Sequence, residues 1–180
     1  MFYYFNAEKK FYENPAPVID PILNNNDWAT IQYAAQNGIA SDYWNVGDRK
    51  EITLNGTCRA RTFSNYKVYA YILGFNHNAT LEGNNTIHFQ IGFDALSEGK
   101  HIALTDIYYN TFDPGFQMNS TATNVGGWSD SFMRNTIIPA FIDCMPSDLQ
   151  DVLKTVNKYT DNHGGGGGDI ESYVTETQDK

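Results

Sequence analysis

The sequence predicts an α+β fold in which short helices and strands are joined by long loops. Residues 51–54 and 86–93 alternate apolar and polar side chains, and residues 66–75 are apolar or aromatic on both faces; both patterns are typical of strands. Residues 28–36 and 129–141 instead repeat apolar side chains at helical spacing. Stretches rich in Asn, Thr, Ser and Gly separate these segments and predict irregular connections.

Residues 1–26 are predicted to form an N-terminal arm. Its prolines, Pro15, Pro17 and Pro21, interrupt regular structure, and an Asn-Asn-Asn run at 24–26 predicts a turn or linker. The arm is expected to precede a globular α+β domain over residues 27–162.

A short helix is predicted to open this domain. Asp27 is expected to cap a helix over residues 28–36, which ends at Asn37-Gly38. The segment that follows, residues 41–48, is predicted to be a loop containing Trp44.

The strands are expected in the middle of the chain. Residues 51–54 and 57–62 are predicted to pair as a hairpin, because Asn55-Gly56 between them is a strong turn signal. Residues 66–75 have apolar or aromatic side chains on both faces and predict a central strand. Further strands are expected over the segments 86–93 and 101–109.

Helical patterning returns after an irregular segment over residues 111–127. A helix is expected to start at Ser129 or Asp130, and Pro139 is expected to kink or end it. A second short helix is expected after Pro146, with Ser147 as its cap.

The C-terminal part is expected to contain a strand over residues 155–160. Five consecutive glycines, residues 164–168, cannot hold regular structure. Residues 163–180 are therefore predicted to form a flexible Gly-rich segment and tail, with a strand-like trio at 173–175.

Composition and charge limit the classes of partner. The chain has 180 residues, of which 14% are aromatic and 18% charged, and its formal net charge is −9. The negative charge argues against nucleic acid as a partner. The longest apolar stretch, residues 68–75, is too short for a membrane span, which needs about 20 residues, so no membrane insertion is expected.

The two cysteines, Cys58 and Cys144, cannot form a framework of several bridges. We favour reduced, buried thiols, although a single disulfide between them stays open. A secretory signal is not expected either, since the N-terminus is aromatic first and basic only later.

Signals for catalysis, metals and cofactors are weak. The four histidines show no helical pairing, and no Cys-x-x-Cys motif, nucleophile elbow or phosphate-binding loop occurs. We therefore predict no catalytic residues, no metal and no cofactor.

Calcium or another ligand has weak candidate residues in one irregular stretch. Oxygen-bearing side chains suit hard cations, but no EF-hand order is present, and such residues also build turns. The candidates, which we interpret mainly as turn residues, are Asn110, Asp113, Asn119 and Asn124.

A sugar-binding face is an alternative use of the many tyrosines, because rings pack on apolar sugar faces while Asn and Asp bond the hydroxyls. Core packing explains most of these rings equally well. Four Asn-x-Ser/Thr sequons begin at residues 55, 78, 84 and 119, but without a signal peptide glycosylation is not expected.

The most specific feature surrounds a Gly-Gly-Trp sequence. Two glycines permit a tight turn before a helix, Trp128 anchors its entry, and Arg134 is placed to pair with Asp130 or to bond loop carbonyls. The residues predicted to have structural roles are Trp28, Trp44, Gly126, Gly127, Trp128, Met133 and Arg134.

The order of several motifs resembles a bacterial and bacteriophage domain family of unknown function, found in phage tail and structural proteins and in Gram-positive surface proteins. The resemblance spans residues 27–160. It is carried by Asp-Trp-Ala-Thr-Ile at 27–31, Tyr-Trp-Asn-Val-Gly-Asp at 43–48, Ile-Leu-Gly-Phe-Asn-His at 72–77, Asn-Val-Gly-Gly-Trp at 124–128 with Ser131 and Met133-Arg134, and Pro-Ser-Asp-Leu-Gln at 146–150.

That family is in turn similar, more distantly, to C-type-lectin-like folds. The resemblance implies a twisted antiparallel sheet with short helices and with long loops for recognition. Family members usually continue into further strands where this chain ends, which implies that the sheet is incomplete at its C-terminus. The family has no established catalytic residues, so the resemblance supplies none.

We therefore expect a non-enzymatic structural or adhesion protein of a bacteriophage particle, in its tail, a fibre or a capsid decoration. Expected partners are other virion proteins or copies of the chain, and a host surface glycan or protein. The alternative is a carbohydrate-binding module on a bacterial cell surface. An enzyme of the formylglycine-generating kind is disfavoured, since Cys58 and Cys144 lie in unlike contexts.

Overall fold

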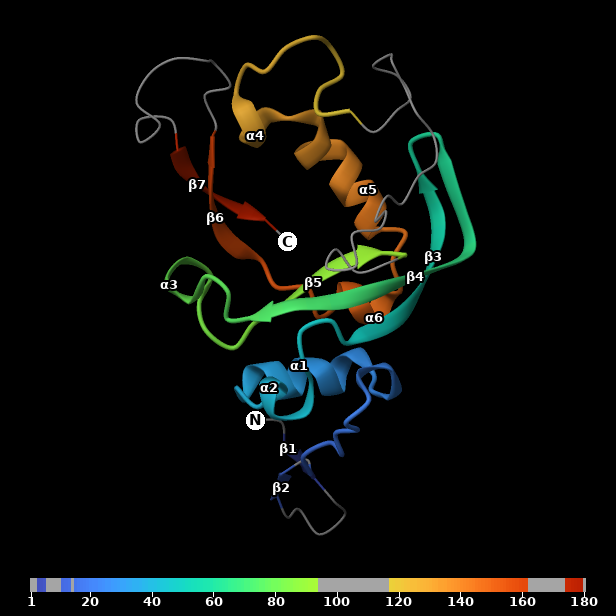
Figure 1. Ribbon diagram of the computed structural model, residues 1–180, viewed down its shortest axis with the longest axis vertical. Helices are drawn as coiled ribbons and strands as arrows, with labels where there is room; N and C mark the ends of the chain where they lie inside the picture. The colour runs from blue at the N-terminus through green and yellow to red at the C-terminus, as the bar shows by residue number, and fades with distance from the viewer. Residues whose placement is uncertain (1–2, 6–10, 14, 94–116, 162–173, 180) are drawn as a thin grey trace.

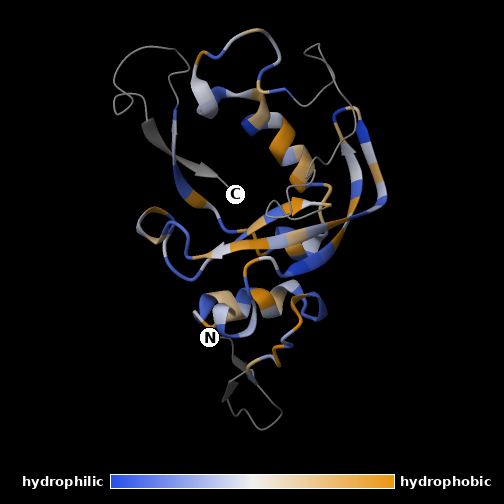
Figure 2. Cartoon of the chain, in the orientation of Figure 1, coloured by the Kyte–Doolittle hydropathy of each residue, from blue (hydrophilic) through white to orange (hydrophobic). Residues whose placement is uncertain are grey.

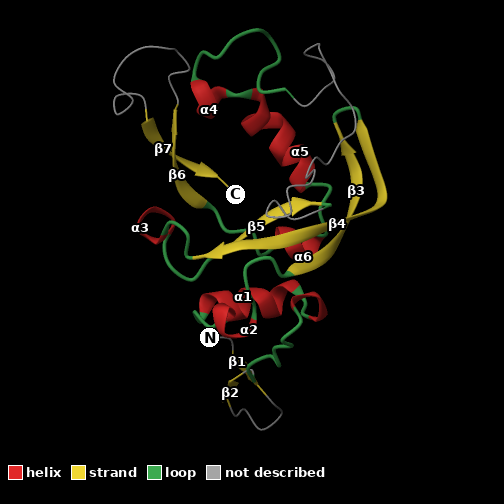
Figure 3. Cartoon of the chain, viewed as in Figure 1, coloured by secondary structure: helices red, strands yellow, loops and turns green. Residues whose placement is uncertain are grey.

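The computed structural model describes residues 3–5, 11–13, 15–93, 117–161 and 174–179 (Figure 1). It is an α+β structure with a three-stranded antiparallel sheet and a few short helices, so the predicted fold class is confirmed at this level. In Figures 1 and 3, α1 and α2 lie on one side of the sheet and α4 and α5 on the other, whereas α6 contacts α1.

The sheet consists of β3 (Arg49–Cys58), β4 (Arg61–Phe75) and β5 (Ile87–Gly92), in the order β3-β4-β5. The prediction of a central strand is confirmed, because β4 pairs with a neighbour on each side. β3 pairs with β4 up to Tyr71, whereas β5 pairs with β4 only from Tyr69 onward. The two pairings therefore overlap over three residues of β4.

The predicted turn at Asn55-Gly56 is wrong. β3 continues through these residues, and the chain reverses at Arg59 and Ala60, where Arg59 has φ +54°. Gly56, with φ +123°, instead lies at a register shift in the hairpin. A side chain there would place its Cβ 3.2 Å from Cys144 Sγ, so glycine lets the strand pass close to Cys144.

The first helix, α1 (Trp28–Gln36), matches its prediction. Asp27 Oδ1 accepts a hydrogen bond of 2.7 Å from the backbone N–H of Thr30 and so caps the helix. The prediction of a loop from residue 41 is wrong at its start, because α2 (Ala40–Tyr43) forms one helical turn there. Ala40 and Trp44, which flank that turn, are both buried and fix it against the core.

The predicted helix from residue 129 is divided into three pieces. α4 (Gly127–Asp130) ends before Ser131, a π-helical turn covers Met133–Ile137, and α5 (Ile138–Ile142) follows. Ser131 causes the break, because its Oγ donates to the Trp128 carbonyl and accepts from the Arg134 N–H, as a cap does. Pro139 falls in the first turn of α5, where a missing N–H does little harm.

The remaining elements are distributed along the chain. α6 (Ser147–Gln150) is the predicted second helix, but Pro146 occupies the cap position and Ser147 makes no capping bond, so that detail is wrong. β6 (Val156–Asp161) confirms the predicted strand and pairs antiparallel with β7 (Val174–Asp179). The others are β1 (Tyr3–Phe5), β2 (Phe11–Glu13), the 3-10 turn η1 (Leu23–Asn25) and α3 (Ala79–Glu82).

Two predicted segments lie outside the described residues: the strand over 101–109 and the glycine run at 164–168. The predicted irregular segment is described only from residue 117, and it contains no helix or strand up to Gly126.

One core joins the helices to the sheet. Figure 2 shows apolar residues along α1, α5 and the sheet. β4 has buried side chains on both faces, as predicted for a central strand: Val68, Ala70 and Ile72 on one face and Tyr71 on the other. The largest side chains that are fully buried are Trp44, Phe63, Leu23, Leu54, Ile72, Ile137 and Val68.

The segment before α1 is fastened to this core. Leu23 is only 2% exposed, and the Trp44 indole Nε1 donates to the Asp20 carbonyl oxygen at 3.1 Å. Asn26 is also buried, and its side chain accepts from the Asp20 N–H and donates to the Asp20 and Ile22 carbonyls. Residues 20–26 are therefore part of the packed structure.

Both cysteines are free and buried, in agreement with the interpretation as thiols. Their Sγ atoms donate to carbonyls one helical turn apart, Cys58 to Ile137 at 3.5 Å and Cys144 to Ala140 at 3.2 Å. Burial, together with the neighbouring Cys144, raises the pKa of Cys58 to about 11 despite the opposing charge of Arg59. Burial likewise raises the pKa of Cys144.

These thiols are expected to react slowly in the folded protein. Reaction needs the thiolate, whose population near neutral pH falls about 100-fold when the pKa rises by about two units. Titration with an aromatic disulfide reagent should release two equivalents of thiol promptly in denaturant and only slowly under native conditions. Fast reaction of both thiols in the native protein would contradict this burial.

Candidate functional site

The most distinctive local geometry lies where β4 and β5 are connected through α3, at a corner we call the α3 corner (residues 75–88). Two asparagines in this connection have left-handed backbone, Asn76 with φ +52° and Asn85 with φ +64°. Asparagine tolerates this conformation better than other side chains, so these residues permit two sharp changes of direction within the corner.

Side-chain amides hold the corner together. The Asn76 N–H donates to the Thr86 carbonyl, and the Thr86 N–H donates to Asn76 Oδ1 at 3.1 Å. Asn85 Nδ2 donates to the Gln36 carbonyl at the end of α1, at 2.9 Å. The corner is thereby fixed both to itself and to the helical layer.

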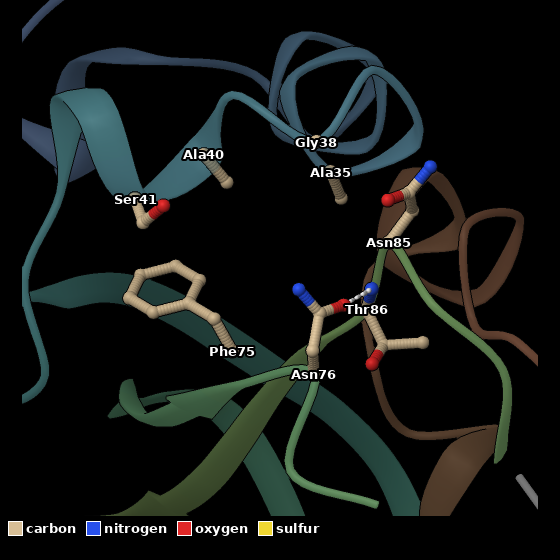
Figure 4. A pocket seen from close by; sticks show the side chains of 8 residues that line it. All are labelled: Ala35, Gly38, Ala40, Ser41, Phe75, Asn76, Asn85 and Thr86. Atoms are coloured by element: carbon tan, nitrogen blue, oxygen red, sulfur yellow. Dashed lines mark hydrogen bonds between the residues drawn. The ribbon is translucent and has the colours of Figure 1, made fainter. Parts of the chain in front are cut away.

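A small depression lies between this corner and the segment that joins α1 to α2 (Figure 4). It is shallow and opens to solvent, with room for about one water molecule. The Phe75 ring forms one wall, and the amides of Asn76 and Asn85 lie on the other side of the opening. The lining residues, none of them charged, are Ala35, Gly38, Ala40, Ser41, Phe75, Asn76, Asn85 and Thr86.

A buried carboxylate lies at the other end of the corner. The Glu82 side chain is 4% exposed, and its Oε2 lies 2.5 Å from His88 Nε2 on β5. Its Oε1 forms an ion pair with Lys158 Nζ on β6, and Lys154 Nζ donates to the Glu82 carbonyl at 3.1 Å. Glu82 therefore connects α3 and β5 to the sheet formed by β6 and β7.

The surroundings of Glu82 keep it ionised. Burial acts to raise the pKa of this carboxyl, but hydrogen bonds from Lys158 and His88, reinforced by their charges, outweigh burial and lower it. A carboxylate with both oxygens engaged acts as a fixed anchor between elements. Within the described residues, no group of three or more His, Cys, Asp or Glu side chains is placed to hold a metal ion.

Of the four residues predicted as weak ligand candidates, the structure describes two. Asn110 and Asp113 lie outside the described residues. Asn119 uses its amide locally, because Nδ2 donates to the Thr123 carbonyl and Oδ1 accepts from the Phe132 N–H. Asn124 is exposed, and its carbonyl accepts from the Gly127 N–H. The latter two are distant in sequence from the α3 corner and act as turn residues.

The residues predicted to have structural roles lie in two places, the core and the region around α4. Trp28 and Trp44 are 3% and 1% exposed in the core. Trp128, Met133 and Arg134 are partly buried around α4 and the π-helical turn, and the Arg134 guanidinium donates to the Ser129 carbonyl. Gly126 and Gly127 both have positive φ at the start of α4, as a tight turn requires.

Substituting Gly126 tests this turn. At Gly126, with φ +78°, an added Cβ would lie 2.2 Å from Asp130 Oδ2, whereas at Gly47, with φ +95°, it would meet nothing within 4 Å. We expect G47A to cost about 1–2 kcal/mol of unfolding free energy from backbone strain alone. G126A should cost about 3 kcal/mol because steric overlap adds to strain. Urea denaturation measures both, and equal losses would contradict the tight approach of Asp130.

Sequence reasoning missed the residues of the α3 corner. It noted the sequons at residues 78 and 84 there and did not consider Glu82, His88 or Asn85 as a group. The available signal was the clustering of Asn residues between two predicted strands, which is typical of left-handed turn positions. The contact of Glu82 with Lys158 had no signal, since 76 residues separate them.

None of the described helices combines the length and apolar character that crossing a lipid bilayer requires. No protein-family model, curated protein or solved structure matches the chain.

Proposed function

We propose that this chain is a non-enzymatic structural or adhesion module of a bacteriophage particle, located in the tail, a fibre or a capsid decoration. The proposal includes a C-type-lectin-like arrangement of the sheet. The order of motifs over residues 27–160 supports it, and short helices on an antiparallel sheet are compatible with it.

The observation that carries the proposal is the way residues 15–26 lie on the body. The segment is anchored by Leu23 and by the bonds of Asp20 and Asn26, yet it turns two aliphatic side chains outward. Val18 is 94% exposed and Ile22 60% exposed. A fixed segment with outward apolar groups is suited to docking on another virion protein or on a second copy of the chain.

The rest of the surface suits display outside a cell. Asn, Thr and Ser dominate the described loop over residues 119–124, and the net charge of −9 keeps the protein away from nucleic acid. In this proposal, exposed loops contact a host protein or glycan while the N-terminal segment attaches the module to the particle.

Sedimentation velocity and electron microscopy test the docking. We expect the full chain to self-associate or to bind particles in a concentration-dependent manner, and the double variant V18S/I22S to lose this association at least 10-fold. The matched control is V125S, which removes an aliphatic side chain that is 77% exposed elsewhere. A monomer that binds no particle at any concentration would contradict the proposal.

The alternative function is a carbohydrate-binding module on a bacterial cell surface. The depression at the α3 corner favours it, because an aromatic wall faced by uncharged amides is the chemistry that sugar recognition uses. A glycan array with the intact chain separates the two functions. Binding to no glycan would leave only the docking role.

A further inference from the structure

We propose that β6 and β7 form a flap that opens from the rest of the molecule as one unit, with the Glu82 carboxylate as the clasp that holds it closed. Removing the negative charge of Glu82, by acid or by substitution, is expected to release the flap. This inference concerns a different part of the chain from residues 15–26 and does not depend on the docking role proposed for them.

The flap has its own backbone pairing. β6 and β7 pair antiparallel with each other along their whole length, and among the described strands neither joins the sheet of β3, β4 and β5. In Figure 3 the two strands stand apart from that sheet, on the side where α3 and α4 lie. Two strands alone are at best marginally stable in water. The flap therefore depends on contacts with the body, which here means residues 15–93 and 117–153.

Apolar packing contributes little to holding β6. No residue of this strand belongs to the hydrophobic core or to the side chains packed against it, the last of which along the chain is Leu153. Tyr159 in β6 is 63% exposed, whereas β4 has buried side chains on both faces. Residues 154 and 155 lie in no helix or strand and connect the flap to the body. Polar contacts therefore carry most of the attachment of β6.

These polar contacts converge on Glu82 at the end of α3. Lys158 Nζ on β6 forms an ion pair with Glu82 Oε1, and Lys154 Nζ, just before β6, donates to the Glu82 carbonyl oxygen at 3.1 Å. On the body side, His88 Nε2 lies 2.5 Å from Glu82 Oε2. The Glu82 side chain is 4% exposed, and removing one partner of a buried pair costs far more than removing one partner of a surface pair. One carboxylate thus fixes the flap to α3 and to β5.

Glu82 is the anion at the centre of a cluster of cations and histidines. The groups in contact with it are Lys154, Lys158 and His88. The His77 ring packs on that of His88, with the two centroids 5.7 Å apart. Neutralising Glu82 therefore removes the negative charge that these groups share.

The carboxylates of the other two elements that contact β6 lie at other positions. Asp130 on α4 lies against Gly126, because a Cβ added there would overlap its Oδ2. Glu176 on β7 is in register with Tyr159, whose side chain alternates to the other face of β6 from that of Lys158. The acid response of the clasp is therefore expected from Glu82 itself.

Acid is expected to open the flap. Burial alone would raise the pKa of Glu82, but the bonds from Lys158 and His88 together lower it below its usual value near 4.5. The carboxylate is therefore charged, and the flap closed, at neutral pH. As the pH falls through the folded pKa, Glu82 takes up a proton and the contribution of the clasp is lost. The sheet of β3, β4 and β5, which apolar packing holds, should stay folded in that range.

Amide hydrogen exchange, followed by NMR on the isotope-labelled full chain, tests the proposal. Each rate is corrected for the intrinsic exchange rate of its sequence and pH. Near neutral pH, the amides of β6 and β7 should exchange as one group, at least about 10-fold faster than those of β4. Below about pH 4.5 the flap amides should lose their protection while the signals of β4 stay at their folded positions.

Two variants with matched controls locate the clasp. In E82Q, near neutral pH, the flap amides should exchange at least about 30-fold faster while β4 stays folded. K158M removes the charge on β6 and keeps the aliphatic stem, so it should act alike, and the double variant should lose less than the sum. The controls E51Q and K67M make the same substitutions in an exposed ion pair of the sheet. Each should change flap exchange by less than about 5-fold.

Several outcomes would overturn the proposal. Equal protection of the flap and β4 in the unmodified chain would rule out a separate opening, and so would loss of the β4 signals together with those of the flap in acid. Flap exchange in E82Q that is no faster than in E51Q would rule out Glu82 as the clasp. The measurements on the unmodified chain need no variant, so they test the flap even if E82Q fails to fold. The self-association lost in V18S/I22S concerns a different segment and is unaffected by these results.

Discussion

Replacing Glu82 with glutamine should lower the unfolding free energy by about 3 kcal/mol, because it removes one partner of a buried charge cluster. The carboxylate is 4% exposed and holds both His88 and Lys158, so the amide loses two charge-assisted bonds and leaves two donors poorly matched. Urea denaturation of E82Q against the unmodified chain measures the loss.

The matched control is the exposed ion pair between Glu51 and Lys67. Their charged atoms lie 2.8 Å apart, but the side chains are 35% and 65% exposed. E51Q removes the same charge by the same substitution, yet a surface pair contributes only about 0–1 kcal/mol. Equal losses in E82Q and E51Q would contradict a special role for Glu82.

The pH dependence gives a second measurement on the same variant. The pKa of Glu82 is lower in the folded chain than its usual value near 4.5, so the unfolded state takes up a proton first as the pH falls. The stability contributed by Glu82 is complete above that usual value and is lost as the pH drops through the folded pKa. E82Q should therefore show a shallower loss of stability below about pH 4.5; an unchanged acid slope would contradict this.

Truncating Trp44 should cost about 3–5 kcal/mol, the range for large aromatic side chains in a core. The side chain is 1% exposed, and its Nε1 bond to the Asp20 carbonyl is one of the contacts that fasten the segment before α1. W44A should thus unfold at lower urea and also show faster amide exchange over residues 20–26 under native conditions.

Two controls separate packing from the hydrogen bond. W44F keeps most of the apolar contact and loses the bond, with an expected cost of about 1 kcal/mol plus part of the cavity cost. Y43A removes a neighbouring ring that is 40% exposed and should change stability by about 0.5 kcal/mol or less. Amide exchange over residues 20–26 that is unaffected in W44A would contradict the anchoring role of the indole.

The sequence predicted the elements whose signals are local. Apolar side chains on both faces identified β4, alternation identified β5, and Asp27 with the following apolar pattern identified α1. The errors arose where tertiary contact overrides a local preference. Asn55-Gly56 has the composition of a tight turn, but the glycine is needed where β3 passes Cys144.

The interior of the C-terminal helical region could not be predicted for a related reason. Ser131 lies between two stretches of helical patterning and caps the second with its own hydroxyl, so one predicted helix becomes several short ones. The contact between Glu82 and Lys158 could not be predicted from the sequence, because the two residues meet only when β6 lies beside α3. A contact between residues so far apart in sequence depends on the topology of the fold. Composition and periodicity indicate local structure and do not predict such a contact.

The limited overlap of the two β4 pairings has a consequence for cooperativity. Within the part of the chain that the structure describes, only Tyr69, Ala70 and Tyr71 have a strand partner on each side, so β3, β4 and β5 form two local hairpins that share three residues. Each hairpin brings together residues close in sequence and can form quickly on its own. The folding of one hairpin is coupled to that of the other through these three shared residues. Loss of a backbone hydrogen bond there would therefore let the two hairpins unfold separately.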